Sequence, residues 1–512
     1  MKHINKSLIF TGTFLIALGF ISCKKTWLDV NTDPNRVTDA NVTPELIFTA
    51  AEAEVGGRAA SGNFTFLNEW MGYVSPNGGF VPQQNIISYN IDFTFGDGLF
   101  QNHYNVLFDL HQAEVKGLAT GDTAVAGASI ILSAKLFQEL VDLYGDVPYS
   151  QAFNVGAYTT PSYDKSQDIY NALQLRLDTA IMYMGLPVKS SFGAADIINK
   201  GKVAKWIKFA NTLKLRLLIR QSEVSGFNPS TEIAKIQNNG GVLGPGESIS
   251  VNPGYVNDVD KQNPYYANFG WNTTGSAQSN QSTDANAYII NILSSTGDNR
   301  IGRFFFPGGF DSTNGWIGNV LGDPIGTLAQ ASESSYWGPG LVGDLDANGV
   351  GTGYSQDQFI YPSYESLFLK AEAVARGWMA GDPNAALTAA IEESFAWIGV
   401  PDAKSAADAY IANNTGITTI GTSSPVSASD IKILAFQKYI ANTVIDPMES
   451  FFDLNRLHFL TDNSYISTLA GKVSNTLPLR LLYPQSEYTT NGKNVPQEVA
   501  SDVFSKKLFW QP

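Results

Sequence analysis

The sequence contains a single cysteine, Cys23, among its 512 residues. A disulfide needs two cysteines and a thiolate metal site needs several, so this chain forms neither within itself. Basic residues are also scarce, because 33 lysines and arginines stand against 47 aspartates and glutamates. An acidic surface repels nucleic acid and anionic lipid headgroups. We therefore expect no nucleic-acid partner.

Common catalytic motifs are missing as well. The sequence has no HExxH zinc motif, no GxxxxGK[ST] phosphate loop and no GxSxG nucleophile elbow. Residues 338–343 spell GxGxxG, but neither a strand before them nor a helix after them is predicted, as a dinucleotide site requires. We therefore expect a protein that is not an enzyme and requires no cofactor. A glycoside hydrolase with unrecognised carboxylates stays open as the alternative, because carboxylate separation is a tertiary property.

Residues 1–22 are typical of a lipoprotein signal peptide. A basic start precedes an uncharged apolar run over residues 8–21, and Ser22 then precedes Cys23. The run is shorter than the roughly 20 residues of a membrane-spanning helix, and we identify no later run of that length. The end of the run resembles a bacterial lipobox, which implies cleavage before Cys23 and acylation of that cysteine. The alternative is an ordinary cleaved signal.

The rest of the sequence predicts a mainly α-helical protein with a loop-rich middle. Residues 23–42 form an Asp/Asn/Thr-rich leader, lipid-anchored at its first residue. Apolar residues recurring every three or four positions predict an N-terminal helical scaffold over 43–225 and a C-terminal one over 362–512. Between them, residues 226–361 are rich in Gly, Asn, Ser and Pro, and predict only one helix, near 284–294. Long irregular stretches of this kind often serve binding.

Seven short segments spread over the chain carry a further indication. They are 28–35 (LDVNTDPN), 143–149 (LYGDVPY), 205–216 with its KW, AN and LKLR, 365–373 (ESLFLKAEA), 437–440 (QKYI), Glu449 with Asp453 and Arg456, and 480–487 (RLLYPQSE). Together, and in this order, they resemble the SusD/RagB family of nutrient-binding outer-membrane lipoproteins. Phe452 and Asn455 depart from the pattern that we expect around Glu449.

The resemblance implies both a fold and a function. The implied fold is SusD-like, mainly α, with tetratricopeptide-like helix pairs and a loop-rich ligand-binding subdomain, and residues 23–512 form one domain. The implied function is non-catalytic capture of a nutrient oligomer, an oligosaccharide or a peptide, for delivery to a TonB-dependent SusC-like transporter barrel. The implied location is the outer membrane of a Gram-negative bacterium, lipid-anchored and facing the cell exterior. A structural adaptor of a transporter, without any small ligand, is a further alternative.

Aromatic residues in polar loops are the candidate ligand-binding residues. Sugar rings present apolar C–H faces that pack on aromatic rings, while neighbouring amides and carboxylates bond to hydroxyls. Any single ring can instead fill the space under a long loop. The candidates are Trp271, Trp316, Trp337 and Tyr336 from the insertion, with Trp70, Tyr73 and Phe80 from an earlier loop stretch.

One loop resembles the first half of a calcium-binding loop. Asp344, Asp346 and Asn348 supply oxygens at positions one, three and five, Gly349 follows, and Val350 offers a backbone carbonyl at position seven. Position twelve is Ser355, where an EF-hand needs a bidentate glutamate. We therefore treat these four residues as candidate ligands of a structural calcium ion. The alternative is a solvated loop closed by Asx turns.

Overall fold

Helix pairs dominate the computed structural model, which describes residues 42–61 and 64–512. Residues 44–512 cluster into one unit. The predicted signal peptide (1–22), the predicted acylation of Cys23 and residues 23–41 of the predicted leader lie outside the described residues. These three predictions therefore stay predictions.

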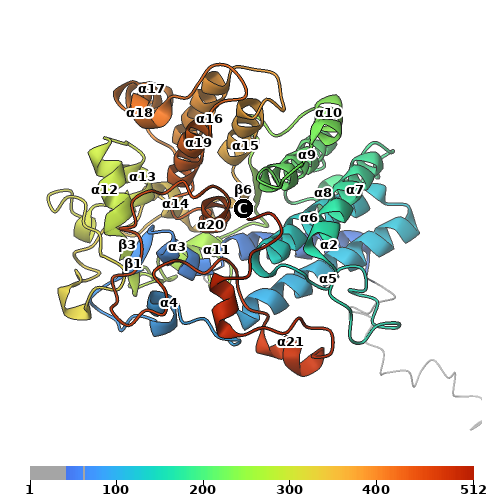
Figure 1. The fold of residues 1–512 in the computed structure, drawn as a ribbon, viewed down its shortest axis with the longest axis horizontal. Helices are drawn as coiled ribbons and strands as arrows, with labels where there is room; N and C mark the ends of the chain where they lie inside the picture. Colours follow the sequence, from blue (N-terminus) through green and yellow to red (C-terminus); the bar gives the residue numbers. More distant parts are fainter. Residues whose placement is uncertain (1–41, 62–63) are drawn as a thin grey trace, which may run out of the picture. The chain divides into compact units, whose positions relative to one another are not determined.

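The N-terminal helices pack side by side in sequence order (Figure 1). Gly121 adopts a φ of 74° and ends one helix, and the Asp122 carboxylate accepts a hydrogen bond from the Val125 N–H (3.1 Å) to begin the next. This two-residue turn makes the two helices antiparallel neighbours. The helices are α2 (Pro44–Ala59), α5 (Asp97–Thr120), α6 (Thr123–Tyr144), α7 (Ser166–Met184) and α9 (Val203–Arg220).

Helix α6 is the most apolar long helix of this scaffold. Among the described residues, it alone is long and apolar enough to cross a membrane. However, 94% of its most apolar window is buried inside the protein. Its composition is therefore explained by its central place between α5, α7 and α9.

The C-terminal helices form a second set of pairs. Three of them begin with a strong local signal: Asp382 and Pro383 begin one helix, a capping box of Ser427 and Asp430 begins another, and Asp446 with Pro447 begins a third. The helices are α15 (Ser363–Ala375), α16 (Pro383–Trp397), α17 (Ala403–Asn413), α19 (Ala428–Ala441) and α20 (Pro447–Leu457). The prediction of a mainly α fold is confirmed.

The predicted insertion, residues 226–361, is less irregular than its composition indicates. The predicted helix near 284–294 is present as α12 (Ala287–Ser295), but α10 (Ser230–Asn238) and α11 (Pro264–Phe269) were not predicted. Short strands form three antiparallel two-stranded sheets: β1 (Val74–Pro76) with β3 (Thr283–Ala285), β2 (Ile249–Val251) with β6 (Gln358–Tyr361), and β4 (Phe305–Phe306) with β5 (Tyr336–Trp337). The β2–β6 and β4–β5 sheets each pair two segments of the insertion, whereas the β1–β3 sheet pairs the insertion with the N-terminal part.

The remaining elements are short. They are α3 (Thr65–Trp70), α4 (Gln84–Ser88), α8 (Phe192–Ala195), α13 (Ile301–Phe304), α14 (Pro339–Val342), α18 (Thr415–Thr418), α21 (Gln485–Thr490), and the 3₁₀ turns η3 (Gly308–Phe310), η4 (Ile325–Thr327), η5 (Gly353–Ser355) and η6 (Ala500–Phe504).

A buried network of charged side chains joins the two sets of helices. Arg220 of α9 contacts Asp142 of α6 through Nε (3.1 Å), and Glu449 (2.7 Å) and Asp453 (3.4 Å) of α20 through its terminal nitrogens. Burial alone would raise the pKa of Asp453, but the charges of Lys438, Arg456 and Arg220 hold it well below its usual range. Breaking such a network would leave uncompensated buried charge. The network therefore fixes how α6, α9 and α20 pack together.

Candidate functional site

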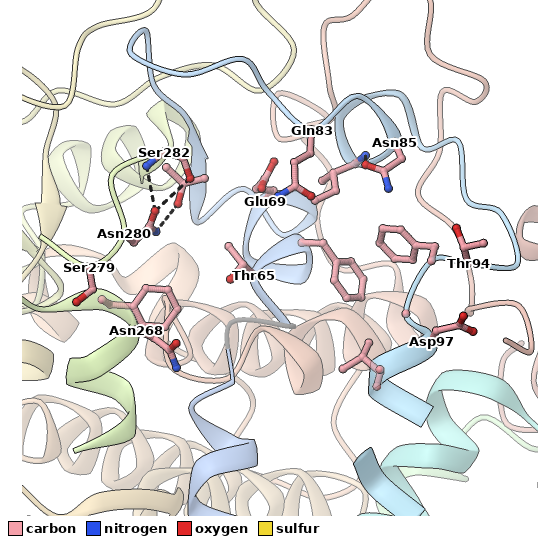
Figure 2. Close-up of a pocket in the computed structure, with 18 residues that line it drawn as sticks. Thr65, Glu69, Gln83, Asn85, Thr94, Asp97, Asn268, Ser279, Asn280 and Ser282 are labelled. Carbon is pink, nitrogen blue, oxygen red and sulfur yellow. Dashed lines mark hydrogen bonds between the residues drawn. The ribbon is translucent and has the colours of Figure 1, made fainter. Parts of the chain in front are cut away.

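A cavity of about 540 Å³ lies between α3, α4, the start of α5 and the chain around residues 268–283 (Figure 2). We call it the α3 pocket. Its lining is rich in uncharged polar side chains, and the described residues that form it include two carboxyl groups, Glu69 and Asp97, but no lysine, arginine or histidine. The amides are Gln83, Asn85, Asn268 and Asn280, the hydroxyls are Thr65, Thr94, Ser279, Ser282 and Thr283, and the aromatic rings are Phe66, Phe95 and Phe269.

Local sequence signals shape the N-terminal wall of the pocket. Thr65 and Glu69 are four residues apart on α3, so their side chains lie on the same face of the helix. The Asp92 carboxylate accepts hydrogen bonds from the backbone N–H groups of Thr94 (2.9 Å) and Phe95 (3.2 Å), which forms a tight turn. Gly96 then adopts a φ of 79° before α5 begins.

The opposite wall comes from residues about 200 positions further along the chain. The Asn280 carbonyl oxygen accepts hydrogen bonds from the backbone N–H (3.1 Å) and the hydroxyl (3.2 Å) of Ser282. The Asn77 amide donates to the Gln281 carbonyl (2.8 Å) and to Asp284 (2.9 Å). The β1–β3 sheet, in which Ser75 is opposite Asp284, thus places this wall against α3.

Aromatic rings line the pocket, and larger rings support them from behind. Phe66 and Phe95 contact each other edge to face, with ring centroids 4.9 Å apart, and Trp70 stacks on Phe95 at 6.2 Å. Phe269 stacks on Trp337 with centroids 4.8 Å apart and ring planes 9° apart. The indoles of Trp70 and Trp337 are both fully buried, so they hold the phenyl rings in place without lining the pocket themselves.

The structure corrects most of the predicted ligand-binding aromatics. A ring without accessible surface cannot stack on a sugar, and five of the seven candidates are core side chains: Trp70, Tyr73, Trp271, Tyr336 and Trp337. The Tyr73 hydroxyl, for example, donates a buried hydrogen bond to the Tyr439 carbonyl (2.6 Å). Trp316 is half-buried and Phe80 is exposed, but neither lines the α3 pocket, so their role stays a prediction.

The predicted calcium loop is closed by hydrogen bonds within the chain. The Asp346 carboxylate accepts from the N–H groups of Asn348 (2.8 Å) and Val350 (3.0 Å), while the Val350 carbonyl accepts from the Asp346 N–H (2.8 Å). Asp344 pairs with Arg303 at 3.3 Å. Across residues 42–61 and 64–512, no three His, Cys, Asp or Glu side chains are grouped to hold a metal ion. The geometry is that of an Asx-turn loop, and calcium binding there stays a prediction.

Glu69 is the most unusual group in the α3 pocket. It belongs to the short helix α3, and the residue is only 3% exposed. One carboxyl oxygen, Oε2, has no hydrogen-bond partner, and no described residue forms an ion pair with it. Burial raises the pKa of Glu69 to about 8. The pocket therefore contains a carboxylic acid that is protonated at neutral pH.

Sequence reasoning missed the lining residues of the pocket. Phe66, Phe95 and Phe269 are not tryptophans, and single phenylalanines are equally typical of core residues. The available signal was the density of Asn, Gln, Ser and Thr around residues 83–94 and 268–283. Which aromatic rings face such polar loops depends on tertiary packing.

Packed helix pairs, with a polar pocket beside a loop-rich segment, define the class of this fold: a mainly α-helical scaffold with an irregular insertion. The comparison with known families identifies the particular family. Residues 34–484 match the SusD-like family described as starch-binding and associating with the outer membrane, and this chain belongs to that family. The predicted resemblance to SusD/RagB proteins is thereby confirmed.

Solved structures support the same fold. A SusD/RagB family protein from Bacteroides thetaiotaomicron superimposes with a TM-score of 0.71 at 18% identity, covering 92% of this chain and 99% of that one. A chitin-binding SusD homologue from Flavobacterium johnsoniae gives a TM-score of 0.71 at 20% identity, covering 90% and 98%. A SusD-like protein from B. thetaiotaomicron gives 0.68 at 22% identity, covering 91% and 98%. Among curated proteins, no relative matches.

Proposed function

We propose that this protein binds a nutrient oligosaccharide in the α3 pocket and does not alter it chemically. The observation that carries the proposal is the lining: amides and hydroxyls beside phenyl rings, in a cavity of about 540 Å³. Sugars offer hydroxyls to the former and apolar C–H faces to the latter. The family description, starch-binding, and the chitin-binding homologue support an oligosaccharide over a peptide.

Calorimetry with the pocket variant Gln83→Ala tests this proposal. Gln83 is exposed and lines the pocket, so its loss removes a hydrogen-bonding group without disturbing the core. Gln167→Ala is the matched control, because Gln167 is an exposed residue of α7 outside the pocket. We expect the wild type to bind starch- or chitin-derived oligosaccharides, the Gln83 variant to bind several-fold more weakly, and the control to bind normally. Equal affinities of all three proteins would reject the pocket as the site.

We further propose that the captured oligosaccharide passes to a SusC-like TonB-dependent transporter barrel. The family's association with the outer membrane supports this partner. An acylated Cys23 would keep the protein beside the barrel, because tethering replaces a bimolecular encounter with a high local concentration. Cys23→Ala should release a folded protein from the membrane fraction. Purification in mild detergent should recover the barrel with the wild type, and failure to recover any barrel would reject the partner.

Glycoside hydrolysis is the second candidate function, and Glu69 is the observation that favours it. A carboxylic acid protonated at neutral pH can act as a general acid, and Asp97 places a second carboxyl group in the same pocket. Incubation with the bound oligosaccharide separates the two functions. Binding without new reducing ends supports capture, whereas new reducing ends that disappear in Glu69→Gln support hydrolysis.

A further inference from the structure

Glu69 is buried at the wall of the α3 pocket with one carboxyl oxygen unpartnered. In Figure 2 it lies between Asn280 and Ser282 on one side and Gln83 and Asn85 on the other. A buried carboxylate without a cation or hydrogen-bond donors loses hydration that nothing replaces. The group therefore needs a proton, a ligand or both.

Among the residues that the structure describes, no lysine, arginine or histidine lines the pocket beside Glu69. Among the described residues, the titratable groups near Glu69 are Asp97, which lines the same pocket, and Tyr89 after α4, whose pKa is raised by burial and, to a small extent, by the Glu69 charge. Packed against α3 is also α20, whose charged residues are Glu449, Asp453 and Arg456. Their ion pairs are made with Arg220, Lys438, Glu372 and one another.

A protonated carboxyl group has one hydrogen to donate, and Glu69 lines the pocket through the small part of its surface that stays accessible. A sugar hydroxyl, ring or acetamido oxygen accepts such a hydrogen bond. An acidic sugar, by contrast, would bring a further negative charge beside Asp97, in a cavity where none of the described lining residues is basic.

We propose that Glu69 is the specificity-determining residue of the α3 pocket: its neutral carboxyl group donates a hydrogen bond to an uncharged oligosaccharide, so that neutral glycans bind and acidic glycans do not. This inference rests on the proposed function and names its substrate class. It makes affinity depend on pH. Binding is complete while Glu69 is protonated and is lost as the pH rises through its pKa of about 8.

The test measures dissociation constants between pH 6 and pH 9 with four hexasaccharide probes. Maltohexaose and N-acetylchitohexaose are neutral, oligogalacturonate is acidic, and the de-N-acetylated chitosan hexamer is cationic. For the neutral hexamer that binds, we expect the wild type to bind about tenfold more weakly at pH 9 than at pH 6, since about one carboxyl group in ten then keeps its proton. The acidic hexamer should bind at least tenfold more weakly than the neutral one at pH 7.

Glu69→Gln is the decisive variant, because its amide has nearly the same shape and donates at every pH. It should bind the neutral hexamer with an affinity independent of pH. Asp97→Asn is the matched control for the other pocket carboxyl group, and it should keep the pH dependence. Near-ultraviolet circular dichroism of each variant checks that the fold is intact.

The outcomes separate this inference from the proposed function. If no oligosaccharide binds at any pH, both the proposed function and this inference are rejected. If neutral hexamers bind equally at pH 6 and pH 9, or if Glu69→Gln keeps the wild-type pH dependence, the proposed function stands and the inference falls. Tighter binding of the chitosan hexamer than of its N-acetylated form would also overturn it, because Glu69 would then pair as a carboxylate with an ammonium group.

Discussion

Replacement of Trp337 by alanine should destabilise the protein and damage the α3 pocket at the same time. Trp337 is fully buried on β5, stacks on Phe269 at 4.8 Å and contacts Tyr336 at 5.2 Å. A buried aromatic side chain removes about 150–250 Å² from water, which corresponds to roughly 4–6 kcal/mol, and tryptophan-to-alanine changes in cores cost about 3–5 kcal/mol. We expect a loss of about 4 kcal/mol, together with weaker oligosaccharide binding, because Phe269 loses the ring behind it.

Urea denaturation followed by circular dichroism measures the free energy of unfolding, and calorimetry measures binding. The half-buried Trp316 gives a matched control, since Trp316→Ala should cost at most half as much and leave binding in the α3 pocket unchanged. A loss of less than about 1 kcal/mol in Trp337→Ala, with binding abolished, would refute the reasoning. Trp337 would then contact the ligand directly, as the sequence first indicated.

Three further predictions follow from buried charge and from the Asp346 loop. The pKa of Glu69 is about 8 in the folded protein against 4.5 for the free group, so the free energy of unfolding of the wild type falls as the pH rises between these values. Glu69→Gln removes this dependence, and at pH 9 its free energy of unfolding, measured by urea denaturation, should exceed that of the wild type by up to about 5 kcal/mol. Equal stabilities would contradict the assigned environment. Arg220→Ala removes the one guanidinium that contacts Asp142, Glu449 and Asp453 together, and it should cost about 3–5 kcal/mol or prevent folding, while removal of the part-exposed Lys235 should cost at most about 1 kcal/mol. A cost below about 1 kcal/mol for Arg220 would show that the network is not needed. If the loop from Asp344 to Val350 binds calcium, a chelator should lower the melting temperature of the wild type and not of Asp346→Ala; an unchanged melting curve in chelator would identify it as an Asx-turn loop alone.

The helical scaffold could be predicted from the sequence because its signals are local. Asp122 begins α6 and Gly145 follows its last turn, and Asp382 with Pro383 begins α16, so short stretches of sequence set these helix ends. Helix α10 was missed because the Gly- and Asn-rich stretches around it lower the average helical signal of the whole insertion.

The pocket could not be predicted in the same way, because it depends on contacts between distant segments. Large indoles in polar loops indicated ligand binding, yet Trp70 and Trp337 are the side chains that fill the space behind smaller phenyl rings. Phe269 reaches the pocket only because β1 pairs with β3, some 200 residues later. Glu69 carries no sequence signal at all, since its raised pKa comes from burial alone.

A crystal structure of the protein with the tightest-binding neutral hexasaccharide tests the central claim most directly. The account predicts sugar density in the α3 pocket, with a ring packed on Phe95 or Phe269, hydrogen bonds to Gln83, Asn85 or Asn280, and a sugar oxygen within hydrogen-bonding distance of Glu69. Sugar bound elsewhere, against the exposed Phe80 or the half-buried Trp316 with the α3 pocket holding only water, would contradict it.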